Sequence, residues 1–157
     1  MTQVAEPEPE RPRAVLFACG QNAVRSPMAA ALARQLLPSA LRVASAGVRK
    51  GELDPFAVAA MAEIGIDIAE HQPVTFEEIE DWEGFDFDLI VTLAPEAHHK
   101  ALALTHRVAA QVEYWPTADP TGIEGNREQR LDAYRAVRDQ LMQRIRARFA
   151  APAGGNE

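Results

Sequence analysis

The sequence reads VLFACGQNAVRSPMAAAL over Val15–Leu32, passing from an apolar run through a polar loop into an Ala-rich segment. A continuous apolar run such as Ala14–Ala18 is typical of a strand that is buried on both faces of a parallel sheet. The segment from about Ser26 to Leu37 has a helical composition, and Pro27 is tolerated in the first turn. The stretch therefore predicts a strand, a loop and a helix of an α/β fold.

The same alternation continues along the chain. Further strands are predicted at Leu41–Ala44, Phe87–Leu93 and Val112–Trp115. Further helices are predicted from Asp54-Pro55 to about Ile64, near Phe76–Asp81, over Pro95–Leu104 and over Asn126–Phe149. Strands that alternate with helices predict a parallel sheet with right-handed crossovers.

The size of the chain indicates one domain. It has 157 residues, of which 47% are apolar, enough for a single core. We expect this domain to span residues 13–149. The flanking segments, 1–12 and 150–157, are rich in Pro, Glu, Gly and Ala and are predicted to be disordered tails.

The net charge and the number of cysteines indicate which partners the protein is unsuited to bind and where in the cell it is expected. The net charge of -7 argues against binding to nucleic acid or to an anionic membrane surface. No signal peptide or membrane-spanning run is recognisable. A single cysteine excludes an internal disulfide, so we expect a cytoplasmic protein with a reduced thiol.

A phosphate-like oxyanion is the ligand that the loop after the first strand predicts. Cys19 and Arg25 frame a C-x5-R-S pattern that ends at Ser26. Loop amides and a helix N-terminus would bind the anion, and the Arg25 fork would hold two of its oxygens. The same positive field favours the thiolate of Cys19, which would lie below the central atom as the nucleophile. Ser26 would donate a hydrogen bond to that thiolate.

The anion would contact the remaining residues of the loop, which are Gly20, Gln21, Asn22, Ala23 and Val24. Gly20 relaxes the backbone in a tight turn, and Asn22 tolerates a left-handed conformation. The alternative is a buried core thiol, the usual role of a lone cysteine. The strand before Cys19, the helix after it and the Arg-Ser pair favour the anion loop.

Two more polar side chains are predicted at the same edge of the sheet. Ligands of parallel sheets bind beyond the carboxyl ends of the strands, where Cys19, Ser45 and Asp119 all fall. Asp119 would protonate a leaving oxygen as general acid, although Asp-Pro also commonly begins a turn. Ser45 either supports the loop through Asn22 or is an ordinary hydroxyl at the end of a strand.

Other conspicuous residues have simpler interpretations. His98 and His99 are predicted on an exposed helix face, and no histidine has the spacing of a metal ligand. Five acidic residues, Glu77, Glu78, Glu80, Asp81 and Glu83, form either a solvated surface or a contact for a partner. Three aromatic residues, Trp82, Trp115 and Phe149, are predicted to lie in the core rather than to form a platform for a substrate.

The chain resembles the low-molecular-weight protein tyrosine phosphatases and the related arsenate reductases over about residues 13–148. The resemblance rests on the Val15–Leu32 stretch, Ser45–Gly47, Asp54-Pro55, Glu63–Ile68 (EIGIDI) and Asp119-Pro120. It implies a three-layer, flavodoxin-like fold whose four parallel strands have the order 2-1-3-4. It also implies Cys19 as nucleophile, Arg25 as oxyanion clamp and Asp119 as general acid and then base. No metal or cofactor is implied, and Asn22, Ser26 and Ser45 would organise the loop.

The chain also departs from that family. Thr121 and Gly122 stand where the phosphatases usually carry aromatic residues after Asp-Pro, and the loop at 48–53 is short and basic. Val91–Leu93 (VTL) is similar to the arsenate reductases, but Ala94 follows it and no second cysteine exists in the chain. Ala23 and Val24 replace the more usual residues before the arginine.

The sequence therefore predicts a cysteine-dependent phosphatase that hydrolyses phosphomonoesters through a cysteinyl-phosphate, with phosphotyrosine in proteins as the expected substrate. Two alternatives stay open. One is reduction of arsenate by an external thiol of the glutathione type, and the other is a non-catalytic regulatory module that binds anions.

Overall fold

The computed structural model describes residues 12–150, and its centre is a parallel sheet of four strands in the order β2-β1-β3-β4. The strands are β1 (Ala14–Cys19), β2 (Arg42–Gly47), β3 (Leu89–Thr92) and β4 (Gln111–Tyr114). The predicted α/β class and the strand order 2-1-3-4 are confirmed. Because all strands are parallel, their carboxyl ends share one edge, where Cys19 pairs with Gly47.

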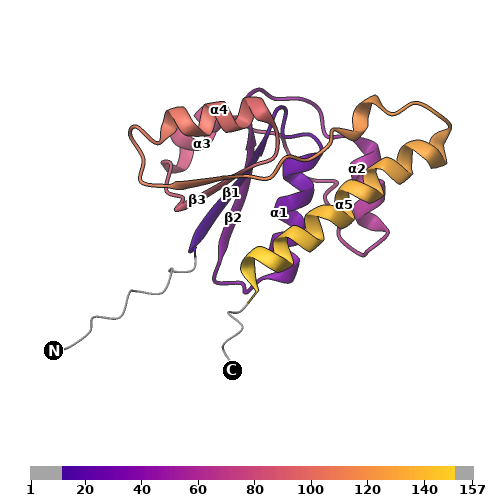
Figure 1. Ribbon diagram of the computed structural model, residues 1–157, viewed down its shortest axis with the longest axis horizontal. Helices are drawn as coiled ribbons and strands as arrows, with labels where there is room; N and C mark the ends of the chain where they lie inside the picture. The colour runs from indigo at the N-terminus through magenta and orange to yellow at the C-terminus, as the bar shows by residue number, and fades with distance from the viewer. Residues whose placement is uncertain (1–11, 151–157) are drawn as a thin grey trace.

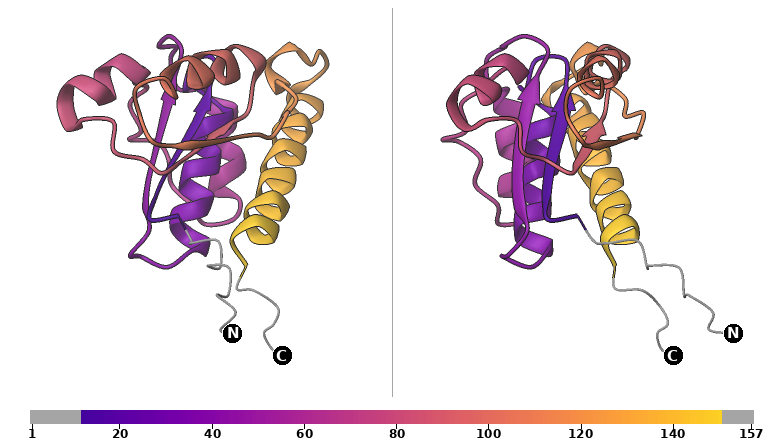
Figure 2. Two further views of the ribbon diagram at one scale, coloured as in Figure 1. Left: turned by 60° about the vertical axis from the view of Figure 1, so that its left-hand side comes forward. Right: turned by 90° about the vertical axis from the view of Figure 1, so that its left-hand side faces the viewer.

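Helices cover both faces of the sheet and complete three layers (Figures 1 and 2). The helices are α1 (Arg25–Leu36), α2 (Pro55–Ala62), α3 (Phe76–Glu83), α4 (Pro95–Leu104) and α5 (Arg127–Phe149), with a short 3-10 helix η1 (Pro120–Gly122). Figure 1 shows α1, α2 and α5 on one side of the sheet and α3 and α4 on the other. Within residues 12–150, no helix combines the length and apolar character needed to cross a bilayer.

Alternation along β1 explains the two cores. Val15 and Phe17 face the core beneath α1, α2 and α5, whereas Leu16 and Ala18 face the core beneath α3 and α4. All four side chains are fully buried. A strand that is apolar on both faces is stable only between two helical layers, so this run determines the three-layer architecture.

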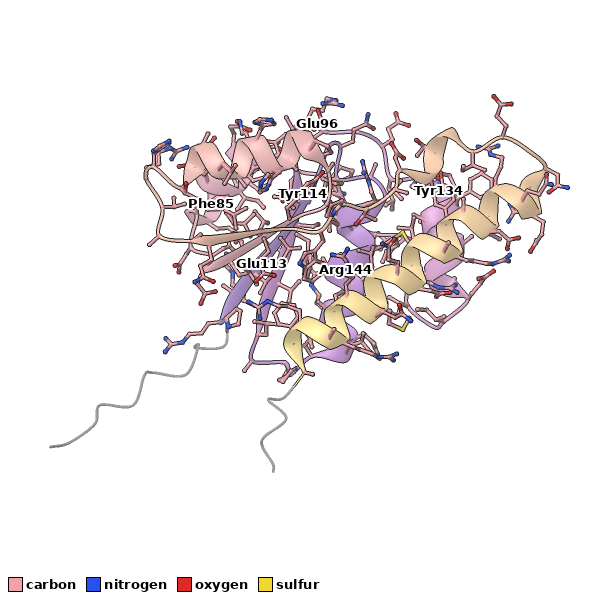
Figure 3. All side chains as sticks on the ribbon, in the orientation of Figure 1. Phe85, Glu96, Glu113, Tyr114, Tyr134 and Arg144 are labelled. Carbon is pink, nitrogen blue, oxygen red and sulfur yellow. The ribbon has the colours of Figure 1, made fainter. Side chains whose placement is uncertain are left out.

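Local sequence sets the helix starts near the site. Asp54 caps α2 by accepting from the Phe56 amide at 2.8 Å, and Pro55 follows at the first helical position. Tyr134 of α5, which is labelled in Figure 3, donates to the other oxygen of Asp54 at 2.6 Å and so ties the two helices together. Thr75 and Asn126 form capping boxes at the starts of α3 and α5.

Several boundaries differ from the prediction. Ser45 lies within β2 rather than after it, because the ladder with β1 continues to Gly47. The third strand is shorter than Phe87–Leu93, and α3 extends beyond Asp81 to Glu83. Apart from Pro12 and Ala150, the tails predicted at 1–12 and 150–157 lie outside the described residues.

The prediction that Trp82 is a core residue is wrong. Its side chain is 65% exposed, whereas Trp115 is buried as predicted and Phe149 is half-buried against the core. Helix α3 packs on the sheet through Phe76 and Ile79, and Trp82 lies beside that narrow stripe.

Surface residues of α3 and α4 also differ in part from expectation. The glutamates of α3 pair with basic side chains of neighbouring segments, as in Glu77–Lys100, Glu78–Lys50, Glu80–Arg107 and Glu83–Arg42. His99 is exposed as predicted, but His98 is half-buried because its ring stacks on Tyr114 and bonds Thr92 at 3.0 Å.

Candidate active site

The loop between β1 and α1 forms the floor of a cavity of about 320 Å³. Cys19 is the last residue of β1 and is 2% exposed, and Arg25 is the first residue of α1. The side walls come from the β2–α2 segment, from Glu96 at the start of α4, and from Asp119 and Thr121. The structure therefore brings Cys19, Arg25 and Asp119 to one cavity at the carboxyl edge of the sheet.

A helix N-terminus without a side-chain cap faces this loop. Val24 occupies the N-cap position of α1 and provides no hydrogen bond, and the first turn contains no acidic residue. The free amides and the positive end of the helix dipole are therefore available for an anion. This arrangement places the partial positive charge of the helix terminus at the floor of the cavity.

Asn22 holds the loop in shape from its centre. It is fully buried, with φ at 56° in the left-handed region. Its Nδ2 donates to Ser26 Oγ at 2.8 Å and to Ser45 Oγ at 2.9 Å, and its Oδ1 accepts from the Val74 amide at 2.9 Å. These bonds join the loop to α1, to β2 and to the segment before α3.

Ser26 links this framework to Cys19. Its Oγ lies 2.9 Å from the Cys19 Sγ. Ser26 Oγ accepts from Asn22 Nδ2, so its own hydrogen has two acceptors within reach, the Cys19 sulfur and the Ala46 carbonyl at 3.4 Å. The Cys19 sulfur is at the shorter distance.

Backbone contacts fix the loop on the segment that follows β2. The amides of Arg49 and Gly51 donate to the carbonyls of Gly20 and Gln21 at 3.0 and 2.9 Å. A Cβ on Gly47 would lie only 2.7 Å from the Asn22 nitrogen and 2.8 Å from the Gln21 carbonyl carbon. Only glycine permits so close an approach of two backbones.

Arg25 joins the loop to the strand-end segment that carries Asp119. Its Nη1 donates to the Thr117 carbonyl at 2.9 Å, and its Nη2 lies 3.9 Å from Asp119 Oδ2. The side chain is only 14% exposed, so the guanidinium is already oriented. A planar fork in this position suits two oxygens of a tetrahedral anion.

Asp119 borders the cavity, but its side chain is more exposed to solvent than suits a general acid. Its side chain is 53% exposed. Burial alone would raise the pKa of Asp119, but hydrogen bonds from the Thr121 amide and hydroxyl and the charge of Arg25 outweigh this and lower the pKa. In the free protein this carboxyl group is therefore ionised at neutral pH.

Sequence reasoning did not find His71. Its Nε2 lies 3.0 Å from Asn22 Oδ1, an acceptor, so the Nε2 of His71 carries the proton and donates. Burial, aided by the charge of Arg34, lowers the pKa of His71, although the bond to Asn22 opposes this shift. His71 lies in an irregular segment without periodicity, so no sequence pattern pointed to it.

The lowered pKa of His71 predicts a pH dependence of folding stability. Below pH of about 6.5 the unfolded chain protonates this histidine while the folded protein keeps it neutral. The free energy of unfolding should therefore decrease as the pH falls from about 6.5 through the lowered pKa of the folded state. Urea denaturation of wild type and H71Q between about pH 7.5 and 5.5 measures this. The variant should show a flatter profile, and parallel profiles would contradict the assignment.

Comparison with known proteins agrees with this geometry. The family described as low molecular weight phosphotyrosine protein phosphatase matches residues 14–152. An arsenate reductase of Bacillus licheniformis is 36% identical over 138 residues, 88% of this chain and 95% of that protein. A glutaredoxin arsenate reductase of Synechocystis sp. is 31% identical over 83% of this chain and 92% of that protein.

Solved structures lead to the same family. An arsenate reductase in a phosphate-binding state has a TM-score of 0.67 and 29% identity, over 88% of this chain and 97% of that one. The match of the family to 14–152 takes in the whole sheet, the loop and Asp119. The chain therefore belongs to the low molecular weight phosphotyrosine protein phosphatase family.

Proposed function

We propose that this protein reduces arsenate, with Cys19 as nucleophile and an external thiol as reductant. The observation that carries the proposal is a lone thiol on the floor of a small polar oxyanion cavity. Among the described residues, no aromatic side chain lines this cavity to stack on the ring of a phosphotyrosine. Relatives of the chain that are named arsenate reductases support the same choice.

The first step is a displacement at arsenic. The loop amides and Arg25 bind the anion, and the thiolate of Cys19 attacks the As(V) centre. A sulfur–arsenic bond forms while one arsenic–oxygen bond breaks. The departing oxygen already carries one proton, takes a second from solvent and leaves as water. Arsenic is still As(V) in this adduct.

The second step carries out the reduction. An external thiolate attacks Cys19 Sγ, so that a disulfide bond forms and the sulfur–arsenic bond breaks. The electron pair of the broken bond stays on arsenic, which becomes As(III) and leaves as arsenite. A second external thiolate then attacks the mixed disulfide and regenerates the Cys19 thiolate, so two thiols become one disulfide for each arsenate.

The reductant must come from outside the chain because Cys19 is its single cysteine. The segment after β3 lies close to Cys19, because the Leu93 amide donates to the carbonyl of the β1 residue Ala18 at 2.8 Å. The next residue is Ala94, however, which has no thiol. A low-molecular-weight thiol of the glutathione type is small enough to approach Cys19 through a cavity of about 320 Å³.

The direct test mixes the protein with arsenate and glutathione and measures both arsenite release and glutathione disulfide. Equal amounts of the two products, dependent on arsenate and enzyme, are the expected result. The test is repeated with glutathione, with a mycothiol-type thiol and with a glutaredoxin-coupled thiol, on folded protein that binds inorganic phosphate. If none of these thiols supports arsenite formation, the proposal is overturned.

Hydrolysis of phosphomonoesters is a second candidate because the carboxyl group of Asp119 borders the same cavity as Cys19 and Arg25. An ester oxygen carries no proton when it departs, so hydrolysis needs a donor beside the anion. The carboxyl group of Asp119, 3.9 Å from Arg25, borders the cavity and could provide it. A dianion that draws Arg25 away from Asp119 would also favour protonation of this carboxyl group.

Replacement of Asp119 distinguishes the two activities. Arsenate already carries protons on its oxygens, whereas an aryl phosphate depends on the enzyme for a proton. We therefore expect D119N to reduce aryl phosphate hydrolysis by about 10²–10³-fold and arsenate reduction by less than about tenfold. Initial rates with both substrates measure the difference, and equal losses would assign Asp119 a structural role.

A further inference from the structure

An exposed ion pair crosses the rim of the cavity. Arg49, from the segment after β2, donates from Nη1 to Glu96 Oε2 at 2.8 Å and from Nη2 to Glu96 Oε1 at 3.1 Å. Glu96 projects from the first turn of α4 (Figure 3). Both residues line the cavity, and we call them the rim pair.

The rim pair lies against the anion loop itself. A Cβ on Gly20 would overlap Oε1 of Glu96 and would lie 3.8 Å from Nη2 of Arg49. Gly20 is the residue next to the nucleophile Cys19. The Glu96 carboxylate and the Arg49 guanidinium therefore lie beside the residue that follows Cys19, next to the site proposed for the oxyanion.

This pair is poorly suited to a structural role. The side chains of Arg49 and Glu96 are 56% and 44% exposed, and exposed pairs contribute little to stability. The hydrogen bond and the charge of Glu96 raise the pKa of Arg49, which therefore stays charged. Arg49 can leave Glu96 at low cost whenever a more negative partner is available.

We propose that the rim pair is a charge-exchange device that determines the affinity of the site for dianions. In the free protein Glu96 neutralises Arg49. When a doubly charged oxyanion enters, Arg49 turns from Glu96 to the ligand, and Glu96 is left as an unpaired negative charge nearby. The two residues act on the anion with opposite sign, so Arg49 and Glu96 are specificity-determining residues.

The inference rests on the proposed function only because both need an oxyanion in the cavity. Its test is therefore the binding of inorganic phosphate, measured by calorimetry at low ionic strength. This measurement involves no turnover. The variants are E96Q, R49Q and the double variant. E80Q is the matched control because Glu80 pairs with Arg107 on the surface and does not line the cavity.

The expected shifts have opposite directions. E96Q frees Arg49 and removes a repulsive charge, so the Kd for phosphate should fall by about five- to tenfold. R49Q leaves Glu96 unpaired beside the anion, so the Kd should rise by about tenfold. The double variant should return to within about threefold of wild type, and E80Q should stay within about twofold.

The outcomes separate the two proposals. Weaker or unchanged binding by E96Q would overturn the charge-exchange device, since a merely structural pair would weaken binding when either partner is lost. No phosphate binding by folded wild type would instead remove the oxyanion site on which the proposed function depends. In turnover assays the same variants should change KM for arsenate while kcat stays nearly constant, because the charge interaction is present before and during reaction.

Discussion

A C19S variant is expected to lose arsenate-dependent thiol oxidation by at least about 10⁴-fold, because it removes the nucleophile and the redox centre together. The serine oxygen is a poor nucleophile at neutral pH, and an oxygen–arsenic adduct offers no sulfur for the external thiol to attack. Cys19 is 2% exposed and lies 2.9 Å from Ser26 Oγ, so the smaller serine oxygen fits without a steric clash.

The same variant should keep its affinity for inorganic phosphate. The anion is bound by the loop amides, the N-terminus of α1 and Arg25, none of which is changed. Removing a negative sulfur below the anion should leave the Kd equal or lower. Calorimetry with phosphate, paired with arsenite release, measures both properties. Near-wild-type turnover would contradict the assignment of Cys19.

An N22A variant is expected to lose about 3–5 kcal/mol of unfolding free energy and most of the activity. The substitution removes the partner of the Ser26 and Ser45 hydroxyls and of the Val74 amide, all at a fully buried site. It also places an alanine at φ of 56°, in the left-handed region. Urea denaturation and phosphate binding measure the two consequences.

The matched variant N22G separates the two causes. Glycine tolerates the left-handed backbone but, like alanine, supplies no amide group. N22G should therefore be more stable than N22A by about 1 kcal/mol, and both should remain well below wild type. Wild-type stability in N22G would show that the hydrogen bonds of Asn22 contribute little and that backbone strain explains the loss in N22A.

Much of the architecture could be predicted from the sequence because the strand and helix patterns along the chain match the three-layer fold that the structure has. The buried run before Cys19 demands helices on both faces, and parallel strands place their carboxyl ends on one edge. Order along the chain was therefore enough to bring Arg25 and Asp119 to Cys19. What these residues do there is a prediction that the experiments above test.

Other contacts depend on tertiary packing and leave no local signal. His71 reaches Asn22 from a segment with neither helical nor strand periodicity. Arg49 and Glu96 are 47 residues apart in the sequence. They meet because the segments that follow β2 and β3 both pass beside the loop between β1 and α1. Hydrophobicity alone misplaced Trp82, since α3 buries only a narrow stripe formed by Phe76 and Ile79.

The close approach at Gly47 has a consequence for how this scaffold diversifies. A Cβ at position 47 would lie only 2.7–2.8 Å from backbone atoms of Asn22 and Gln21, so this position beneath the loop accepts glycine alone. Arg49 and Glu96, by contrast, are exposed at the rim and can change with little effect on folding. Substitutions at the rim can therefore change which ligand the cavity prefers while the loop keeps its shape, so ligand preference can diverge in evolution without loss of the scaffold.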